Sequence, residues 1–214
     1  MAWCYNGLGL IARYLGKLQE AKELLQKSHD IHKEHDNKRN MADALQNLGL
    51  VALDLKEYDK AIAIYEDARK IYEEKFFGTV PHIIGNLLTN VGLCYRRKND
   101  LVSAEKNYLE SLRVKANAVG WDHPIIAVNY MNLGTLEMVR KNWKAAEDYA
   151  KKCIEIYKIN LYPEDNYNHR RALENLLFAW MMMDRYDDEV QDMFWRLCEY
   201  SHLSKMLATI CNQN

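Results

Sequence analysis

Three histidines are the first side chains in this sequence whose type and spacing could support chemistry. His29, His32 and His35 recur every third residue among three acidic side chains, and imidazole with carboxylate is a donor set that binds divalent metals. A spacing of three residues drifts around a helix, so the three rings do not share one face. We therefore interpret this segment as a solvated helix end and expect no metal site.

His123 and a methionine triplet are the other candidates. An acid/base or metal role for His123 would require a carboxylate pair or a second histidine at ligand spacing, and neither lies nearby. Met181–Met183 could form a soft metal site or an adaptable binding surface, although core packing is the usual role of such residues. The sequence has no Gly-rich phosphate loop, no Gly-x-Ser-x-Gly elbow and no His-Glu-x-x-His motif. We expect no enzyme and no cofactor.

The composition is that of a folded protein without an electrostatic preference. The 29 Lys and Arg nearly balance the 30 Asp and Glu, which gives no reason to expect nucleic acid or an anionic membrane as a partner. The longest apolar run, Leu176–Met183, is too short to span a bilayer, so no membrane insertion is expected. Five widely spaced cysteines with no CxxC pair favour reduced thiols and a cytoplasmic location.

An internal repeat organises the chain. Its anchor is a glycine that follows Asn-Leu or a close variant, and successive anchors lie 40, 43, 42 and 43 residues apart. Leu replaces the glycine in the fifth repeat. The five anchors are Gly9, Gly49, Gly92, Gly134 and Leu177. Twelve residues after each anchor comes a small residue in four of the five repeats: Ala21, Ala61, Ala104 and Ala146.

Each repeat is predicted to form two amphipathic helices joined by a short turn, because apolar residues recur at spacings of three and four on both sides of a break. Two helices joined by such a turn cross closely, and the small residues at the anchor and twelve positions later suit that crossing. The chain opens directly on this periodic sequence without a leader or cap, which leaves open that it belongs to a longer protein.

This arrangement resembles the tetratricopeptide repeat (TPR), whose Leu-Gly, Tyr and Ala positions are matched by Leu48-Gly49, Tyr58, Ala61, Tyr65 and Ala68. The usual repeat is ~34 residues, and the longer link Gly120–Pro124 is similar to that of kinesin light chains. The resemblance implies an all-α, right-handed superhelical solenoid of five helix pairs with a C-terminal capping helix. We assign one solenoid to residues 1–200, with repeats at 3–35, 41–76, 82–118, 123–160 and 168–199, and the cap to residues 201–214.

The links between repeats contain residues that suit helix starts. Asp122 is expected to cap the next helix, with Pro124 in its first turn. Thr79 with Pro81 is expected to act in the same way one repeat earlier, and Pro163 with the two acidic residues after it one repeat later. His123 is interpreted as a structural residue of its link.

The resemblance also implies a concave groove lined by the first helix of each pair, where side chains at fixed offsets from the anchor meet a ligand. An Asn two residues before the anchor can bond a peptide backbone or, equally, a neighbouring helix. The predicted groove residues are Arg13, Asn47, Asn90, Arg96, Arg97, Met131, Asn132, Met138, Asn175 and Phe178.

The predicted partner is a protein or peptide. Arginines dominate the charged groove positions of the first three repeats, and apolar residues those of the last two, so we expect a ligand with an acidic portion and an apolar anchor. Met181 and Met182 are almost as well explained by packing against the capping helix. We predict a protein–protein interaction adaptor. The alternative is a structural or oligomerising segment of a larger sensor or regulatory protein, with the groove occluded.

Overall fold

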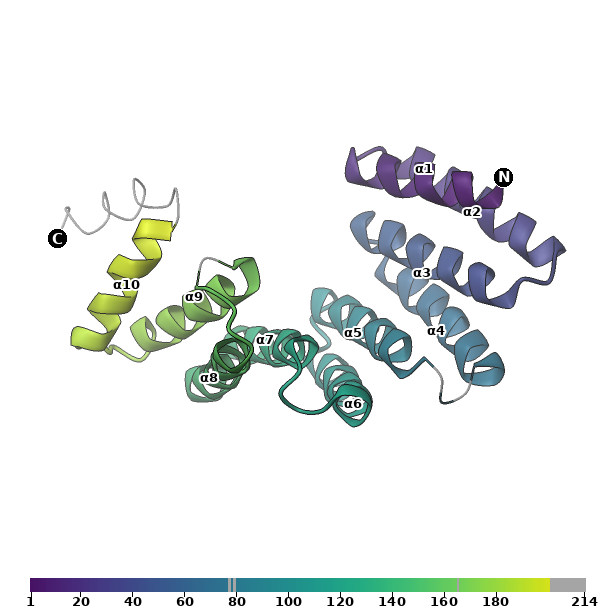
Figure 1. The fold of residues 1–214 in the computed structure, drawn as a ribbon. Helices are drawn as coiled ribbons and strands as arrows, with labels where there is room; N and C mark the ends of the chain where they lie inside the picture. The colour runs from purple at the N-terminus through teal and green to yellow at the C-terminus, as the bar shows by residue number, and fades with distance from the viewer. Residues whose placement is uncertain (77, 79, 165, 201–214) are drawn as a thin grey trace. The chain divides into compact units, whose positions relative to one another are not determined.

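A computed structural model of the chain describes residues 1–76, 78, 80–164 and 166–200. Within these residues the chain forms ten α-helices and no strand (Figure 1). The helices belong to two compact units, Met1–Ala118 and Val119–Asn214. The predicted all-α repeat fold of five helix pairs is confirmed for this part of the chain. The predicted capping helix, residues 201–214, lies outside the described residues.

Each repeat contributes a first and a second helix. In unit 1 the helices are α1 (Ala2–Tyr14), α2 (Leu18–Glu34), α3 (Lys38–Asp54), α4 (Tyr58–Lys75), α5 (Pro81–Arg97) and α6 (Leu101–Val119, whose last residue is counted with unit 2). In unit 2 they are α7 (Pro124–Val139), α8 (Trp143–Ile159), α9 (Tyr167–Met181) and α10 (Asp188–Tyr200). None of the described helices is both long and apolar enough to cross a bilayer.

The turn inside every pair has the same backbone geometry. One residue seven positions after the anchor adopts a positive φ, which is the left-handed conformation that commonly ends a helix. Glycine takes this conformation without strain, and Asn and Asp tolerate it better than other side chains. The five residues, with their φ angles, are Gly16 (75°), Lys56 (61°), Asn99 (65°), Lys141 (61°) and Asp184 (55°).

The anchor glycines mark the closest approach between the two helices of a pair. A Cβ built at Gly49 would lie 2.4 Å from a ring carbon of Tyr65, and one at Gly92 would lie 2.7 Å from the ring of Tyr108. The predicted close crossing is confirmed. The side chain that fills it stands sixteen residues after the anchor, four residues beyond the predicted alanine, so glycine is needed because an aromatic ring lies against the backbone.

The helix starts differ in detail from the predicted caps. The N-cap of α7 is His123, whose Nδ1 accepts a hydrogen bond from Ile125 N at 3.2 Å, so Asp122 is not the cap. The N-cap of α9 is Asn166, whose Oδ1 accepts from Asn168 N and His169 N; the predicted cap near Pro163 is therefore wrong by a few residues. Pro81 and Pro124 begin α5 and α7 as expected, and Thr79 lies outside the described residues.

A buried carboxylate joins α8 to α9 in unit 2. Glu147 Oε1 accepts a hydrogen bond from Trp180 Nε1 at 3.0 Å and lies 2.7 Å from Lys151 Nζ, while Oε2 lies 2.9 Å from Lys144 Nζ. Burial alone would raise the pKa of Glu147, but these three donors outweigh it and hold the pKa at about 2. Charge and packing therefore act together at this helix contact.

Substitution of an anchor glycine tests the crossing. Gly92→Ala should lower the free energy of unfolding by ~1–3 kcal/mol, because the new methyl group would overlap the Tyr108 ring and lie 3.2 Å from the Ala104 carbonyl oxygen. The matched control is Gly134→Ala, whose Cβ would meet Tyr149 Cβ at 3.3 Å. There the helix preference of Ala over Gly, ~1 kcal/mol, should offset the contact. Equal effects in urea unfolding would contradict this account of the crossing.

The Glu147 cluster predicts an acid-dependent stability. The pKa of Glu147 is lower in the folded state, at about 2, than its unfolded value of 4.5, so its ionised carboxylate stabilises the fold. This contribution is complete above pH 4.5 and is lost as the pH falls toward about 2. Glu147→Gln should remove on the order of 3 kcal/mol at neutral pH and flatten the stability profile over that range. Glu155→Gln, an exposed change on the same helix, should do neither. Unfolding curves at several pH values measure both, and a Glu147→Gln profile as steep as that of the wild type would contradict the assignment.

Candidate functional site

The first helices of unit 1 line a hollow of about 400 Å³ that we call the first-helix groove. Three helices and one turn contribute to it, so its residues come from three successive repeats. The lining residues are Arg13 from α1; Leu50, Leu53 and Asp54 from α3; Lys56 and Tyr58 from the turn and start of α4; and Asn90, Leu93 and Arg97 from α5. Arg13, Asn90 and Arg97 were predicted to share a groove, and the structure brings them to one hollow.

Positive charge exceeds negative charge in this groove. Arg13 Nε forms an ion pair with Asp54 Oδ2 at 2.6 Å, and both side chains remain about one-third exposed. Arg97 and Lys56 are exposed, and neither has an ion-pair partner among the described residues. The groove therefore presents two uncompensated cations above a floor of three leucines.

Asn90 is suited to contact a ligand backbone. It lines the groove, is half-buried, and has no hydrogen-bond partner among the residues that the structure describes. Asn47, one repeat earlier, differs, because its Nδ2 donates to Asn6 Oδ1 on α1 at 3.0 Å. Of the two interpretations of these asparagines, the bond to a neighbouring helix therefore applies to Asn47, and Asn90 keeps its amide available.

Arg96 is adjacent to Arg97 but lies in a different environment. It is half-buried, its Nε is shielded from solvent without a hydrogen-bond partner, and it does not line the first-helix groove. Its charge acts on the buried Tyr108 hydroxyl: burial raises the pKa of Tyr108, and the Arg96 guanidinium partly opposes that rise. Arg96 therefore belongs to the packing between α5 and α6.

The predicted groove residues of unit 2 are mainly apolar and unequally accessible. Met131 is only 6% exposed, so its side chain is part of the core and cannot meet a ligand. Met138, Asn132 and Asn175 are half-buried. Phe178 is 45% exposed, and its ring packs edge-to-face against Trp143 with the centroids 6.0 Å apart. An apolar subsite in this unit would therefore rest on Phe178 and Met138.

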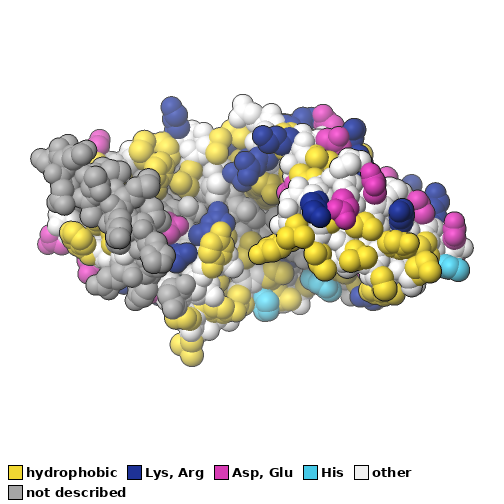
Figure 2. All heavy atoms as spheres, turned by 90° about the horizontal axis from the view of Figure 1, so that it is seen from above, with side chains coloured by type: hydrophobic (Ala, Val, Ile, Leu, Met, Phe, Trp, Pro, Cys, Tyr) yellow, Lys and Arg dark blue, Asp and Glu magenta, His cyan; other side chains and the backbone are white. Residues whose placement is uncertain are grey.

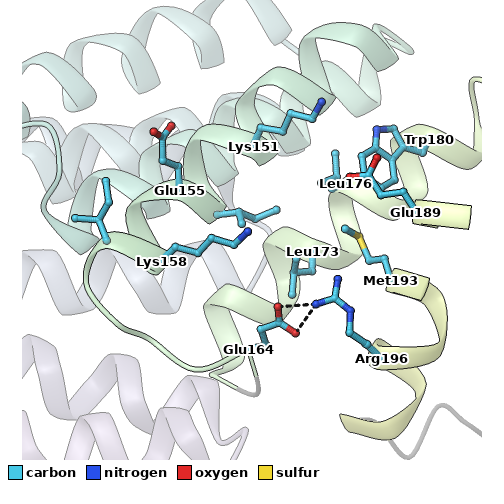
Figure 3. Close-up of a pocket in the computed structure, with 12 residues that line it drawn as sticks. Lys151, Glu155, Lys158, Glu164, Leu173, Leu176, Trp180, Glu189, Met193 and Arg196 are labelled. Atoms are coloured by element: carbon cyan, nitrogen blue, oxygen red, sulfur yellow. Dashed lines mark hydrogen bonds and ion pairs between the residues drawn. The ribbon is translucent and has the colours of Figure 1, made fainter. Parts of the chain in front are cut away.

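Unit 2 has two further hollows. Figure 3 shows one of about 380 Å³ among α8, α9 and α10, with Leu173, Leu176 and Met193 on its walls and charged residues at its rim. Most of those charges are already paired: Arg196 Nη1 bonds the Glu164 carboxylate at 2.9 and 3.2 Å, and Lys151 is paired with Glu147. The second hollow, between α9 and α10, is almost entirely apolar. None of the ten predicted groove residues lines either hollow.

Among the described residues, those at the histidine-rich end of α2 included, no group of three His, Cys, Asp or Glu is placed so that it could hold a metal ion. His32 is buried against Trp3, with ring centroids 6.0 Å apart, and burial lowers its pKa. The expectation of a solvated helix end is thus wrong for His32, because this face of α2 packs against α1.

Sequence reasoning missed Lys56 and Tyr58 as site residues and did not pair Arg13 with Asp54. Lys56 occupies the left-handed turn position and Tyr58 begins α4, and neither lies on a first helix, where the search was made. The signal for the ion pair was present: Arg13 and Asp54 stand four and five residues after their anchors, on adjacent first helices.

Comparison with known proteins supports the repeat assignment. A family model described as tetratricopeptide repeat matches residues 1–74 and 84–159. No protein of curated function matches the sequence significantly. Among solved structures, the chain is similar to BtubC (BKLC) from P. vanneervenii, with a TM-score of 0.77 and 17% identity over 90% of this chain and 76% of that one.

Two other solved structures show the same fold. The nearly identical TPR-like repeats described as those of a kinesin light chain from Podosopora anserina give a TM-score of 0.73 and 14% identity, covering 96% of this chain and 95% of that one. The apo form of RapI gives 0.73 and 16% identity, covering 99% and 72%. At these identities the similarity extends to the fold alone.

The contrast between the two arginines predicts separable effects. Arg96→Glu should destabilise the protein by ~1–3 kcal/mol, because it would place a carboxylate beside the buried Tyr108 ring and hydroxyl. Arg97→Glu should change stability by less than ~0.5 kcal/mol, because Arg97 is exposed and unpaired. Urea unfolding of each single variant measures both effects. If Arg97→Glu proved as damaging as Arg96→Glu, Arg97 would be a packing residue and not a groove residue.

Proposed function

Because the chain belongs to the tetratricopeptide repeat family, whose fold generally serves protein–protein interaction and is typically non-catalytic, we propose that it is an adaptor that binds a peptide segment of a partner protein in the first-helix groove. The segment is extended and carries carboxylates. A single observation carries this proposal: Arg13 from the first repeat and Asn90 and Arg97 from the third, chosen by their offsets alone, line one hollow.

The groove chemistry favours an acidic ligand with apolar side chains between its carboxylates. Arg97 and Lys56 offer cations that no carboxylate of the described chain satisfies, and charge-assisted hydrogen bonds to carboxylates are stronger than neutral ones. Asn90 can both donate to and accept from a peptide backbone. Leu50, Leu53 and Leu93 would receive apolar side chains of the ligand.

The Arg13–Asp54 pair makes the groove selective. A ligand carboxylate placed beside Arg13 would compete with Asp54 for the guanidinium, and Asp54 would repel it. A carboxylate beside Arg97 meets no such competition. In this proposal the ligand residue that contributes most to binding is an acidic residue beside Arg97, and the ligand residue near Asp54 is uncharged.

Unit 2 offers an apolar surface of its own. Phe178 and Met138 expose apolar side chains on first helices, and an aromatic or aliphatic side chain of a partner would bury them. We also propose a cytoplasmic location, because Cys4, Cys94 and Cys153 are free thiols and a reducing compartment preserves them.

A matched pair of labelled peptides tests the groove. One is a decapeptide alternating Glu with Leu, and the other has Gln in place of every Glu. The intact chain should bind the Glu peptide about tenfold more tightly in fluorescence anisotropy, a difference of ~1.4 kcal/mol, and added salt should reduce that difference.

Two charge reversals locate the binding. Arg97→Glu should abolish the preference for the Glu peptide, whereas Arg113→Glu, an exposed change on α6 away from the groove, should leave it within about twofold, since it alters the net charge equally. Equal losses from both reversals would show that only net charge matters and would refute the groove. No preference for the Glu peptide in the wild type would refute the acidic ligand.

A further inference from the structure

The polar side chains of the first-helix groove are mostly hydrogen-bond donors. Lys56 and Arg97 are exposed cations without an ion-pair partner among the described residues. Asn90 and Tyr58 line the same groove, and neither side chain has a hydrogen-bond partner in the described part of the chain. Lysine and arginine side chains only donate hydrogen bonds, and an amide or a phenol can donate as well. Asp54, the carboxylate of the groove, is already held in an ion pair at 2.6 Å. These donors suit a ligand group with several acceptor oxygens.

The charged pairs around the groove differ from these two cations. Figure 2 shows that over the N-terminal helices, at the right of this view, most Lys and Arg side chains lie beside Asp or Glu side chains. Two such pairs involve the start of α4: Lys98 Nζ bonds Asp59 Oδ1, and Lys22 Nζ lies 3.9 Å from Glu57 Oε2. The carboxylates nearest to the groove are therefore taken by other lysines.

The two cations stand at the same end of the groove. Arg97 is the last residue of α5, and Lys56 belongs to the turn between α3 and α4. The ion pair between Lys98 and Asp59 joins the end of α5 to the first turn of α4. Because Arg97 and Lys56 flank that ion pair in the sequence, one anionic group in the groove could meet both of them.

Two cations at one end of a groove are matched by a group that carries two negative charges. A carboxylate carries one charge on two oxygens, so a carboxylate beside Arg97 leaves Lys56 uncompensated. A phosphorylated side chain carries a charge of about −1.5 to −2 at neutral pH and three acceptor oxygens. It could bond Arg97 and Lys56 together and still accept a hydrogen bond from Asn90.

We propose that the acidic residue recognised by the first-helix groove is a phosphorylated serine of the partner segment, held between Arg97 and Lys56. Apolar neighbours of the phosphoserine lie on the leucine floor of the groove. This inference rests on the proposed function and names the chemistry of its ligand. Arg97 contacts any acidic ligand, whereas Lys56 distinguishes a phosphoryl group from a carboxylate. Phosphorylation of the partner therefore strengthens the interaction.

Four labelled peptides test this inference on the full chain. Three are decapeptides that alternate Gln with Leu and carry phosphoserine, Glu or Ser in place of one central Gln; the fourth alternates Glu with Leu throughout. In fluorescence anisotropy at neutral pH, the phosphoserine peptide should bind about tenfold more tightly than the single-Glu peptide, and more tightly than the fourth peptide. Inorganic phosphate should compete far less well than an equal concentration of unlabelled phosphoserine peptide, because it makes no contact with the leucine floor.

A lysine substitution locates the second charge. Lys56→Gln should bring the affinities for the phosphoserine and single-Glu peptides within about twofold of each other, and should change the affinity for the Glu peptide little, since a carboxylate needs only Arg97. The matched control is Lys60→Gln, which removes the same charge from an exposed lysine that does not line the groove. It should leave the preference for phosphoserine intact. Circular dichroism checks that both variants fold.

The pH dependence of binding gives a second readout. The second ionisation of a phosphorylated side chain has a pKa of about 6, so the affinity for the phosphoserine peptide should rise between about pH 5 and pH 7.5. The affinity for the Glu peptide should change much less. The charged and ionisable residues that line the groove include no histidine, so this difference reports on the phosphoryl group. They are Arg13, Asp54, Lys56, Tyr58 and Arg97.

The outcomes separate this inference from the proposed function. Equal affinities for the phosphoserine and single-Glu peptides, equal losses from the two lysine variants, or parallel pH profiles would overturn the phosphoserine assignment. So would a fourth peptide that binds as tightly as the phosphoserine peptide, because two carboxylates would then suffice, or full competition by inorganic phosphate. In each of these cases the acidic-peptide groove stands if the Glu peptides still bind more tightly than the Ser peptide. If no charged peptide binds more tightly than the Ser peptide, the proposed function fails as well.

Discussion

The contact between an anchor glycine and the side chain sixteen residues later is the constraint on which the rest of the structure depends. At Gly9, Gly49 and Gly92 a Leu or Tyr side chain lies where a Cβ would be, with prospective contacts of 2.4–2.7 Å. This contact fixes how deeply the second helix sits on the first. Once that depth is set, the remaining faces of the first helix are assigned: one packs on the preceding pair and one lines the groove.

The contact at the anchor changes in the last two repeats because their residues differ. In the fourth repeat the residue sixteen positions after Gly134 is Ala150, so a Cβ at Gly134 would meet Tyr149 Cβ at 3.3 Å and the Ala146 carbonyl oxygen at 3.7 Å, both longer than the contacts at the first three anchors. In the fifth repeat Leu177 replaces the glycine, and Met193, sixteen positions later, is buried. The Glu147–Trp180 bond supplies a polar contact between α8 and α9 in this same unit. Unit 2 thus has a less tight contact at its anchors than the first three repeats, together with a buried ion network.

The periodicity of the sequence predicted the features that the repeats share. It failed where two neighbouring residues have different environments in the structure. It located the anchors, the turns and three residues of one groove, because offsets from an anchor translate directly into helix faces. It could not separate Arg96 from Arg97, which are adjacent, although Arg96 is half-buried and Arg97 is exposed and lines the groove. It also placed Met131 in the groove, although α7 is apolar nearly all round and its pattern does not distinguish core from groove. The shift of the α7 cap from Asp122 to His123 is a one-residue difference of the kind that sequence patterns do not resolve.

The charged residues of the first-helix groove can meet a ligand because they lie outside the core, whereas Leu50, Leu53 and Tyr58 of the same groove also pack against it. A first helix uses one face on its own second helix and another on the preceding pair, and both are constrained to small or apolar residues of fixed size. Offsets +4 and +5 fall on the third face, where Arg13, Asp54 and Arg97 carry charge at little cost to stability. Ligand chemistry can therefore vary on this face while the fold is kept.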